Sequence, residues 1–230
     1  MTADSIRWSY TGASGPAYWG SLSEEYRTCA LGAEQSPIDI TGYTPGDGLL
    51  VAFHYFGVAI AARNNGHTAY LDYRPGNAID VGGQRYELQG IHYHSPSEHT
   101  LDGESFAAEL HLVHQDTDGT LAVIGLLYRL GEANPSVQHI LDAAPDGIGS
   151  IDLTYGPPAA DYVPASTDYY GYDGSLTTPP CTEGVRWMVM QFVGTVSQSQ
   201  VERLQELTHG PNNRPLQPVG SRSIIAVGAP

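Results

Sequence analysis

Short runs of β-branched and aromatic residues, separated by glycine and asparagine, recur through this 230-residue sequence. Such runs are typical of strands, because these side chains suit a pleated, half-buried backbone, whereas Gly and Asn favour turns. Asp118-Gly119, between two of the runs, is a strong hairpin signal. The predicted strands are 49–56, 67–73, 85–94, 107–115, 121–128 and 186–196. The chain is therefore expected to be built mainly of strands.

Two segments carry the sequence signals of helix ends instead. Asn134 and Pro135 suit an N-cap and a first helical turn, ahead of an apolar stripe. Ser199 and Glu202 predict a capping box at the start of a second helix. The expected fold class is thus α+β and mainly β, with a few short helices.

The sequence shows no internal repeat, no low-complexity segment and no linker. Residues 1–48 are rich in Gly, Pro and Ser and are predicted to wrap irregularly on the surface. Hydrophobic residues make up 41% of the chain and charged residues 15%, which is enough for a large core. We therefore expect a single domain over residues 1–230.

The charge balance excludes two classes of partner. All 10 basic residues are arginine, and 25 acidic residues bring the net charge to −15 at pH 7. Such a surface repels nucleic acid phosphates and anionic membranes. No apolar run approaches the 20 or so residues that a membrane helix needs, so no membrane partner is expected either.

The two cysteines, Cys29 and Cys181, allow two interpretations. Paired, they would join the N-terminal segment to a distant loop and indicate an oxidising compartment. Unpaired, they would be two unrelated buried thiols, and their spacing does not decide between these readings. The N-terminus has none of the charged and apolar regions of a signal peptide, so any such peptide is expected to have been removed already.

The strongest chemical signal is a group of histidines on two predicted neighbouring strands. His92 and His94 are two residues apart and therefore point to the same face of a strand. His111 on the next strand can complete a set of three imidazoles with one open position, the arrangement of a catalytic zinc. Glu109, two residues before His111, is placed to accept the second ring N–H of a ligand histidine. The alternative is a set of hydrogen-bonded core histidines.

A second metal site is compatible with the same residues. Cupins, which are small β-barrels, carry His-x-His, a nearby glutamate and a later histidine. His92, His94 and Glu98 with His111 or His114 would give an iron or manganese site in a dioxygenase or isomerase. Against this interpretation, the Pro-x-Gly turn of the second cupin motif is absent before the last histidine.

Motifs along nearly the whole chain resemble those of the α-class carbonic anhydrases, and they occur in the family's order. They are Trp8-Ser-Tyr10, Gly15-Pro16-Ala-Tyr-Trp19-Gly20, Gln35-Ser-Pro-Ile-Asp-Ile40, Asn64-Asn65-Gly66-His67, Ser97-Glu98-His99-Thr100, Ala107-Ala-Glu-Leu-His-Leu-Val-His114, Ser175-Leu-Thr-Thr-Pro-Pro180 and Asn213-Arg-Pro-Leu-Gln-Pro218. The resemblance implies a central twisted, mostly antiparallel sheet of about ten strands with a few peripheral helices. It also implies a zinc enzyme that interconverts carbon dioxide and bicarbonate.

The resemblance assigns a role to each site residue. It makes His92, His94 and His111 the Zn²⁺ ligands, and it makes Thr177 the residue that orients a zinc-bound hydroxide and donates its own proton to Glu98. Glu98 would then not be a ligand, which separates this assignment from the cupin one. The remaining pocket residues are Thr178 on the bicarbonate side and an apolar wall for carbon dioxide made of Val113, Val123, Leu176, Val185 and Trp187.

Further expectations follow from the same resemblance. His67 would carry the surplus proton to solvent, helped by Tyr10 and Asn65, although a solvated loop histidine is the plainer interpretation. Cys29 and Cys181 would form one disulfide, which favours a periplasmic or secreted protein. Sulfonamides and anions are the expected inhibitors, and a homodimer is compatible with the family. A non-catalytic relative on the same fold is the third candidate.

Three positions depart from the family's pattern. Gly90 replaces a glutamine whose amide would accept the second N–H of His92. Tyr70 replaces a smaller polar residue of the pocket, which predicts a narrower mouth. Asp173 replaces a proline ahead of the active-site loop.

Overall fold

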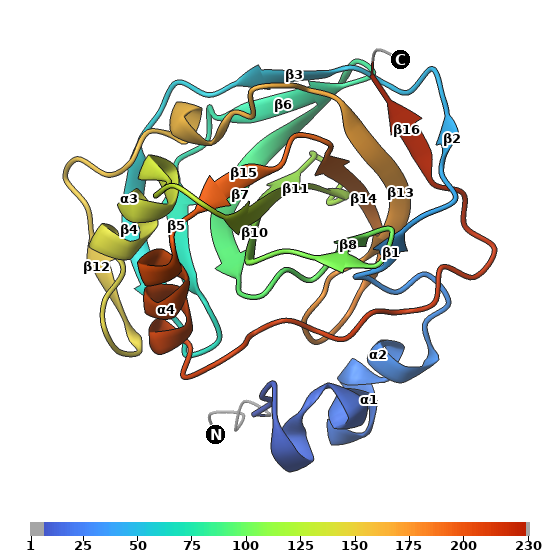
Figure 1. Cartoon of the computed structure of the whole chain (residues 1–230), viewed down its shortest axis with the longest axis horizontal. Helices are drawn as coiled ribbons and strands as arrows, with labels where there is room; N and C mark the ends of the chain where they lie inside the picture. The colour runs from blue at the N-terminus through green and yellow to red at the C-terminus, as the bar shows by residue number, and fades with distance from the viewer. Residues whose placement is uncertain (1–6, 229–230) are drawn as a thin grey trace.

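The strand-forming runs assemble into one large sheet in the computed structural model, which describes residues 7–228. This sheet has 13 strands, and its main path runs β12-β4-β5-β7-β10-β11-β14-β13-β16-β2. Figure 1 shows the strands curving around the centre of the molecule. Their bounds are β2 Thr44–Pro45, β3 Val51–His54, β4 Ala59–Asn64, β5 Ala69–Tyr73, β6 Ala78–Val81, β7 Gln84–His94, β10 Ala108–Gln115, β11 Leu121–Leu130, β12 Gly149–Asp152, β13 Tyr169–Ser175, β14 Glu183–Met190, β15 Gly194–Val196 and β16 Ile225–Val227.

Most pairings in this sheet are antiparallel, as expected, and the mainly β class with few short helices is confirmed. The exceptions are parallel pairings of β11 with β14 and β15 and of β16 with β2. The main path has the expected ten strands, and the sheet is larger because β3, β6 and β15 join it off this path. A separate three-stranded sheet contains β1 Asp39–Ile40, β8 Thr100–Leu101 and β9 Glu104–Ser105.

The predicted 186–196 strand is wrong as a single element. It is two strands, β14 and β15, which pair with different parts of β11. The chain bends at Gln191, directly after β14, where the backbone N–H of Gln191 still donates to Asp168 O at 2.9 Å in the register of β13 and β14. The predicted 67–73 strand begins later than expected, at Ala69, so His67 lies in the preceding turn.

The hairpin signal at Asp118-Gly119 is confirmed. β10 and β11 pair antiparallel on either side of it, and Gly119 has a φ of 90°, a conformation that suits glycine. Asp116 closes the turn, because its carboxylate accepts the backbone N–H groups of Asp118 and Thr120. This turn fixes the register of β10 and thereby the position of His111.

Two helices cover one face of the sheet: α3 Pro135–Ala143 and α4 Gln198–Leu207. The predicted N-cap of α3 is confirmed, because the Asn134 side chain accepts the backbone N–H groups of Ser136 and Val137. The apolar sides of both helices pack into a cluster with alternate residues of the central strands. Its members include Leu71, Ile91, Leu110, Leu112, Ile124, Val137, Ile140, Leu141, Leu204 and Leu207.

The predicted capping box of α4 is wrong by two residues. Ser197 is the N-cap, and Gln200 is its reciprocal partner, in place of Ser199 and Glu202. Gln200 is preferred because it is buried and its side chain also bonds both backbone groups of Asn134 at 2.8 Å. The box therefore couples the starts of α3 and α4.

The first part of the N-terminal segment, with its short helices, lies outside the large sheet at the bottom of Figure 1. The whole segment contains two single-turn helices, α1 Trp19–Leu22 and α2 Thr28–Leu31, three 3₁₀ turns at Gly12–Ser14, Pro16–Tyr18 and Glu24–Tyr26, and the strands β1 and β2. A fourth 3₁₀ turn, Ala159–Tyr162, lies elsewhere. The expected irregular wrap is thus correct in outline, although two of its segments join sheets.

A disulfide between Cys29 and Cys181 ties this N-terminal segment to the rest of the chain. Both residues are buried in a small cluster with Trp19, so the pairing expected from the family resemblance is confirmed. Within residues 7–228 no helix is long and apolar enough to cross a membrane.

Candidate active site

The site is built on neighbouring strands whose registers align its residues in rows. Tyr70 on β5 is opposite His92 on β7, and His92 is opposite His111 on β10. His94 is opposite Glu109 in the same way. Because residues two apart share a face, the three histidines and the glutamate project from one side of the sheet, away from α3 and α4.

The three predicted ligand histidines converge. One nitrogen from each lies within 4.8 Å of the others, and the ring centroids are 4.6 to 5.2 Å apart. Burial, together with the neighbouring His111 and His94, lowers the pKa of His92 well below its usual value. Burial lowers the pKa of His94 to about 4. Burial also lowers the pKa of His111 below its usual value. All three imidazoles are therefore neutral at pH 7, which is the form that binds a metal.

Hydrogen bonds assign the free nitrogen of two of these rings. His94 Nδ1 donates to the backbone oxygen of Asn212 at 2.7 Å, which leaves its Nε2 free. His111 Nε2 donates to Glu109 Oε1 at 2.9 Å, which leaves its Nδ1 free. The buried Nε2 of His94 has no hydrogen-bond partner among the described residues. A metal ion can bind a buried, unpaired ring nitrogen that lies close to the free nitrogens of two other histidines. The three histidines therefore fit a metal ion.

Glu109 is fully buried and accepts hydrogen bonds at both oxygens. Oε1 accepts from His99 Nδ1 at 2.7 Å as well as from His111, and Oε2 accepts the backbone N–H groups of Glu98 and His99. Although burial raises the pKa of Glu109, the two imidazoles outweigh it and hold that pKa well below the usual value. The ionised carboxylate fixes the tautomer of His111, as the sequence predicted for a ligand histidine.

His99 is a functional residue that sequence reasoning missed. Its Nε2 is 2.6 Å from the Tyr172 hydroxyl, which in turn is 2.8 Å from the Ser36 hydroxyl. These contacts extend the hydrogen bonds of Glu109 toward the N-terminal segment. His99 appeared in the sequence only as part of a motif, and its spacing from Glu109 carried no signal of a contact.

Glu98 lies beside the histidines. Its Oε1 accepts the backbone N–H of Arg214 at 2.8 Å, and its Oε2 is 3.5 Å from His94 Nε2. Burial raises the pKa of Glu98 to about 7, against opposing effects of His111, Thr177 and the Arg214 N–H. The Thr177 side chain is a hydrogen-bond partner of this carboxyl group.

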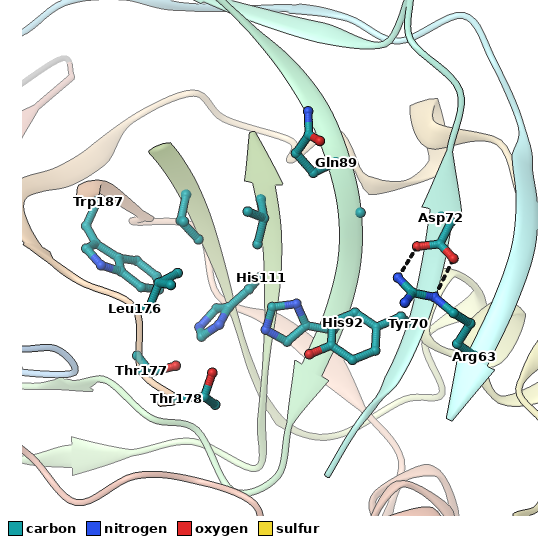
Figure 2. Close-up of a pocket in the computed structure, with 13 residues that line it drawn as sticks. Arg63, Tyr70, Asp72, Gln89, His92, His111, Leu176, Thr177, Thr178 and Trp187 are labelled. Atoms are coloured by element: carbon teal, nitrogen blue, oxygen red, sulfur yellow. Dashed lines mark hydrogen bonds and ion pairs between the residues drawn. The ribbon is translucent and has the colours of Figure 1, made fainter. Parts of the chain in front are cut away.

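A pocket of about 230 Å³ opens onto this cluster. Figure 2 shows Leu176, Thr177, Thr178 and Trp187 on the side of His111, and Tyr70, Arg63 and Asp72 beyond His92. Val113 and Val123 also line the pocket. Val185, also predicted for the wall, is not among the lining residues and packs in the cluster with Trp187 and Val123.

The predicted proton-transfer residues lie in the turn before β5 and the N-terminal segment. His67 is partly buried, and its ring stacks on Trp8 with centroids 3.8 Å apart at 10°. The Tyr10 ring is 6.2 Å from His67, while its buried hydroxyl has no hydrogen-bond partner among the described residues. Asn65 closes the turn by accepting the backbone N–H groups of His67 and Thr68. Burial lowers the pKa of His67.

The cupin interpretation is wrong. His114, one of its candidate ligands, is buried elsewhere: its Nε2 is 2.6 Å from the Tyr55 hydroxyl, and its Nδ1 is 3.3 Å from Ala122 O. His114 is three residues after His111 on the same strand, so its side chain points to the opposite face of the sheet. The large open sheet also differs from a small barrel.

The comparisons with known proteins agree with one another. The model of the eukaryotic-type carbonic anhydrase family matches residues 14–228. A carbonic anhydrase of Pectobacterium carotovorum is 39% identical over 225 residues, which cover 96% of this chain and 91% of the relative. A hyperthermostable carbonic anhydrase from an active hydrothermal vent chimney matches with a TM-score of 0.93 at 42% identity, covering 96% of this chain and 100% of the other. The α-carbonic anhydrase from Thermovibrio ammonificans, solved with the inhibitor sulfanilamide, gives a TM-score of 0.92 at 37% identity, covering 96% and 99%.

Proposed function

The chain belongs to the eukaryotic-type, or α-class, carbonic anhydrase family, and we propose that it hydrates carbon dioxide reversibly at a zinc ion held by His92, His94 and His111. The convergence of three neutral imidazoles at the base of the pocket is the observation that carries this proposal. Zinc bound there acts as a Lewis acid that activates water near neutral pH.

The histidines and their partners hold the ligand geometry. Asn212 and Glu109 fix the rings of His94 and His111 in the tautomers that leave one nitrogen free for the ion. Because both partners are buried and paired, the rings are pre-organised and little reorganisation is needed when the ion binds. A zinc ion held by these three nitrogens would keep a fourth ligand position for water.

Thr177 and Glu98 orient the attacking oxygen. The Thr177 hydroxyl accepts a hydrogen bond from the O–H of the attacking water and donates its own O–H in a hydrogen bond to the Glu98 carboxylate. This relay directs a lone pair toward the carbon of the substrate. The backbone N–H of Thr177 polarises a substrate oxygen, and Thr178 contacts the bicarbonate product.

Apolar side chains bind the substrate. Carbon dioxide is linear and uncharged, so it offers a protein little besides van der Waals contact. Val113, Val123, Leu176 and Trp187 line the pocket and supply such contact. Val185 supports Trp187 from within the same cluster.

His67 transfers the surplus proton to solvent. A shuttle needs a pKa near the working pH and access to both the site and the solvent. His67 is partly buried at the junction of the N-terminal segment and the sheet. Tyr10 and Asn65 position this region by ring contact and by the turn that Asn65 closes.

The disulfide favours an oxidising location, so we infer a periplasmic or secreted protein. Sulfonamides and small anions are the inhibitors that the proposed zinc site would bind, and the Thermovibrio ammonificans enzyme was solved in complex with the sulfonamide sulfanilamide.

Stopped-flow hydration of carbon dioxide tests the proposal. The zinc-loaded chain should hydrate carbon dioxide rapidly, lose this activity after chelation and regain it when zinc returns. His94→Ala should be inactive at the same zinc concentration, while His139→Ala, at a partly buried histidine of α3 that pairs with Asp161, should hydrate carbon dioxide like wild type. A fully zinc-loaded chain without hydration activity would favour the non-catalytic alternative.

A further inference from the structure

His92 is held differently from the other two histidines of the proposed zinc site, on which this inference rests. His94 and His111 each have one ring nitrogen in a hydrogen bond to Asn212 or Glu109. Nδ1 of His92 is buried and has no hydrogen-bond partner among residues 7–228. The orientation of the His92 ring must therefore come from another contact.

The strand that carries His92 offers no such contact. The residue two positions earlier, on the same face, is Gly90, which has no side chain to reach the ring. A Cβ added at Gly90 would lie 3.0 Å from the backbone oxygen of Leu71, so the strands approach too closely there for a side chain to fit without adjustment.

Tyr70 on the neighbouring strand occupies the space beside the ring. It is directly opposite His92 in the register of β5 and β7, and the two ring centroids are 5.0 Å apart at 41°. Figure 2 shows the tyrosine ring adjacent to the His92 imidazole on the side away from His111. Rings at this distance and tilt attract each other and restrict each other's rotation.

Tyr70 is itself held in place. Arg63 is its cross-strand neighbour on β4, and the guanidinium carbon lies 5.4 Å from the centre of the tyrosine ring. Two hydrogen bonds join Arg63 to the Asp72 carboxylate, as the dashed lines of Figure 2 show. A row of side chains thus runs across three strands, from Arg63 through Tyr70 to His92.

We propose that Tyr70 is a positioning residue for the zinc ligand His92. Its ring, backed by the Arg63–Asp72 pair, keeps the metal-binding nitrogen of His92 directed at His94 and His111. Ring contact takes the place of the hydrogen bond that the other two ligands have. The phenol hydroxyl is not required for this role, because the constraint comes from the faces and edges of the rings.

Zinc release from the loaded chain to an excess of chelator tests the proposal. Tyr70→Leu removes the ring and should release zinc about tenfold faster, since losing the outer partner of a ligand histidine typically weakens metal binding by a factor of about 10 to 100. Tyr70→Phe keeps the ring and should release zinc within about twofold of the wild-type rate on the same reasoning. Tyr170→Leu, which removes a partly buried tyrosine of β13, is the matched control and should match wild type.

A second readout separates positioning from general loss of stability. The visible spectrum of the Co²⁺-loaded protein reports ligand geometry, and it should change in Tyr70→Leu but not in Tyr70→Phe. If Tyr70→Leu does not fold, Arg63→Ala, at a half-exposed position, should still accelerate zinc release relative to Tyr170→Leu.

Wild-type rates of release in both Tyr70→Leu and Arg63→Ala would overturn the proposal. Release from Tyr70→Phe as fast as from Tyr70→Leu would also overturn it, because the hydroxyl would then be the important group. A wild-type chain that takes up no zinc would instead overturn the zinc site itself, and this inference with it.

Discussion

Replacing Glu109 with glutamine changes one atom of the site and removes its central charge. The carboxylate accepts two hydrogen bonds at each oxygen: the imidazoles of His99 and His111 at Oε1, and the N–H groups of Glu98 and His99 at Oε2. An amide has an NH₂ group in place of one of these oxygens. In either orientation that NH₂ group faces two donors.

The cost follows from the bonds that are lost. A hydrogen bond to a charged group contributes about 1.5 to 3 kcal/mol, so losing two lowers the free energy of unfolding by about 3 to 6 kcal/mol. If the NH₂ group faces the imidazoles, His111 must move its proton to Nδ1, the nitrogen proposed for zinc. Zinc affinity should then fall about 10-fold to 100-fold.

Denaturant unfolding of the zinc-free protein and chelator competition for zinc measure the two effects separately. Glu206→Gln, at an exposed carboxylate of α4 that pairs with Arg203 at the surface, is the control and should leave both quantities near wild type. A Glu109→Gln variant with wild-type stability and zinc affinity would refute the reasoning about this buried carboxylate.

Three further predictions address the fold. Ser197→Ala should cost about 1 kcal/mol of unfolding free energy because it removes the true N-cap of α4, whereas Ser199→Ala should cost little, and equal costs in thermal unfolding would contradict this assignment. Replacing both Cys29 and Cys181 with serine should destabilise the protein by about 4 to 5 kcal/mol, because the bond joins residues 152 apart in the sequence. Unfolding in denaturant measures this loss of stability, and a clearly smaller loss would contradict the prediction. Burial lowers the pKa of His114 to about 3, so below pH 6.5 the unfolded chain binds a proton that the folded chain does not, and stability falls toward pH 3 by up to about 1.4 kcal/mol per pH unit. His114→Gln should reduce this slope in denaturation measured at pH 7 and pH 5, and an unchanged slope would argue against it.

Strand alternation and turn propensity, which depend only on neighbouring residues, predicted the strands β7 and β10 that carry the site. His92 and His94 share a face, as do Glu109 and His111, because strand geometry has a period of two, and the Asp118-Gly119 turn sets how β11 pairs with β10. These features depend on residues close together in the sequence. Residue spacing therefore indicated that the three imidazoles could converge, and the family resemblance assigned them as a ligand set.

Contacts between segments far apart in the chain could not be predicted from the sequence. His99 reaches Tyr172 across 73 residues, and Asn212 reaches His94 across 118. The capping box was misplaced for a similar reason, since Gln200 is selected by its bonds to Asn134 on another helix. Spacing within one segment carries no information about such partners.

Zinc-edge anomalous diffraction from crystals of the zinc-loaded chain tests the central claim most directly. We predict one strong anomalous peak at bonding distance from a nitrogen of His92, Nε2 of His94 and Nδ1 of His111. Glu98 should not be a ligand of the ion at this peak. A peak that includes Glu98 as a ligand, or no peak at these histidines, would contradict it.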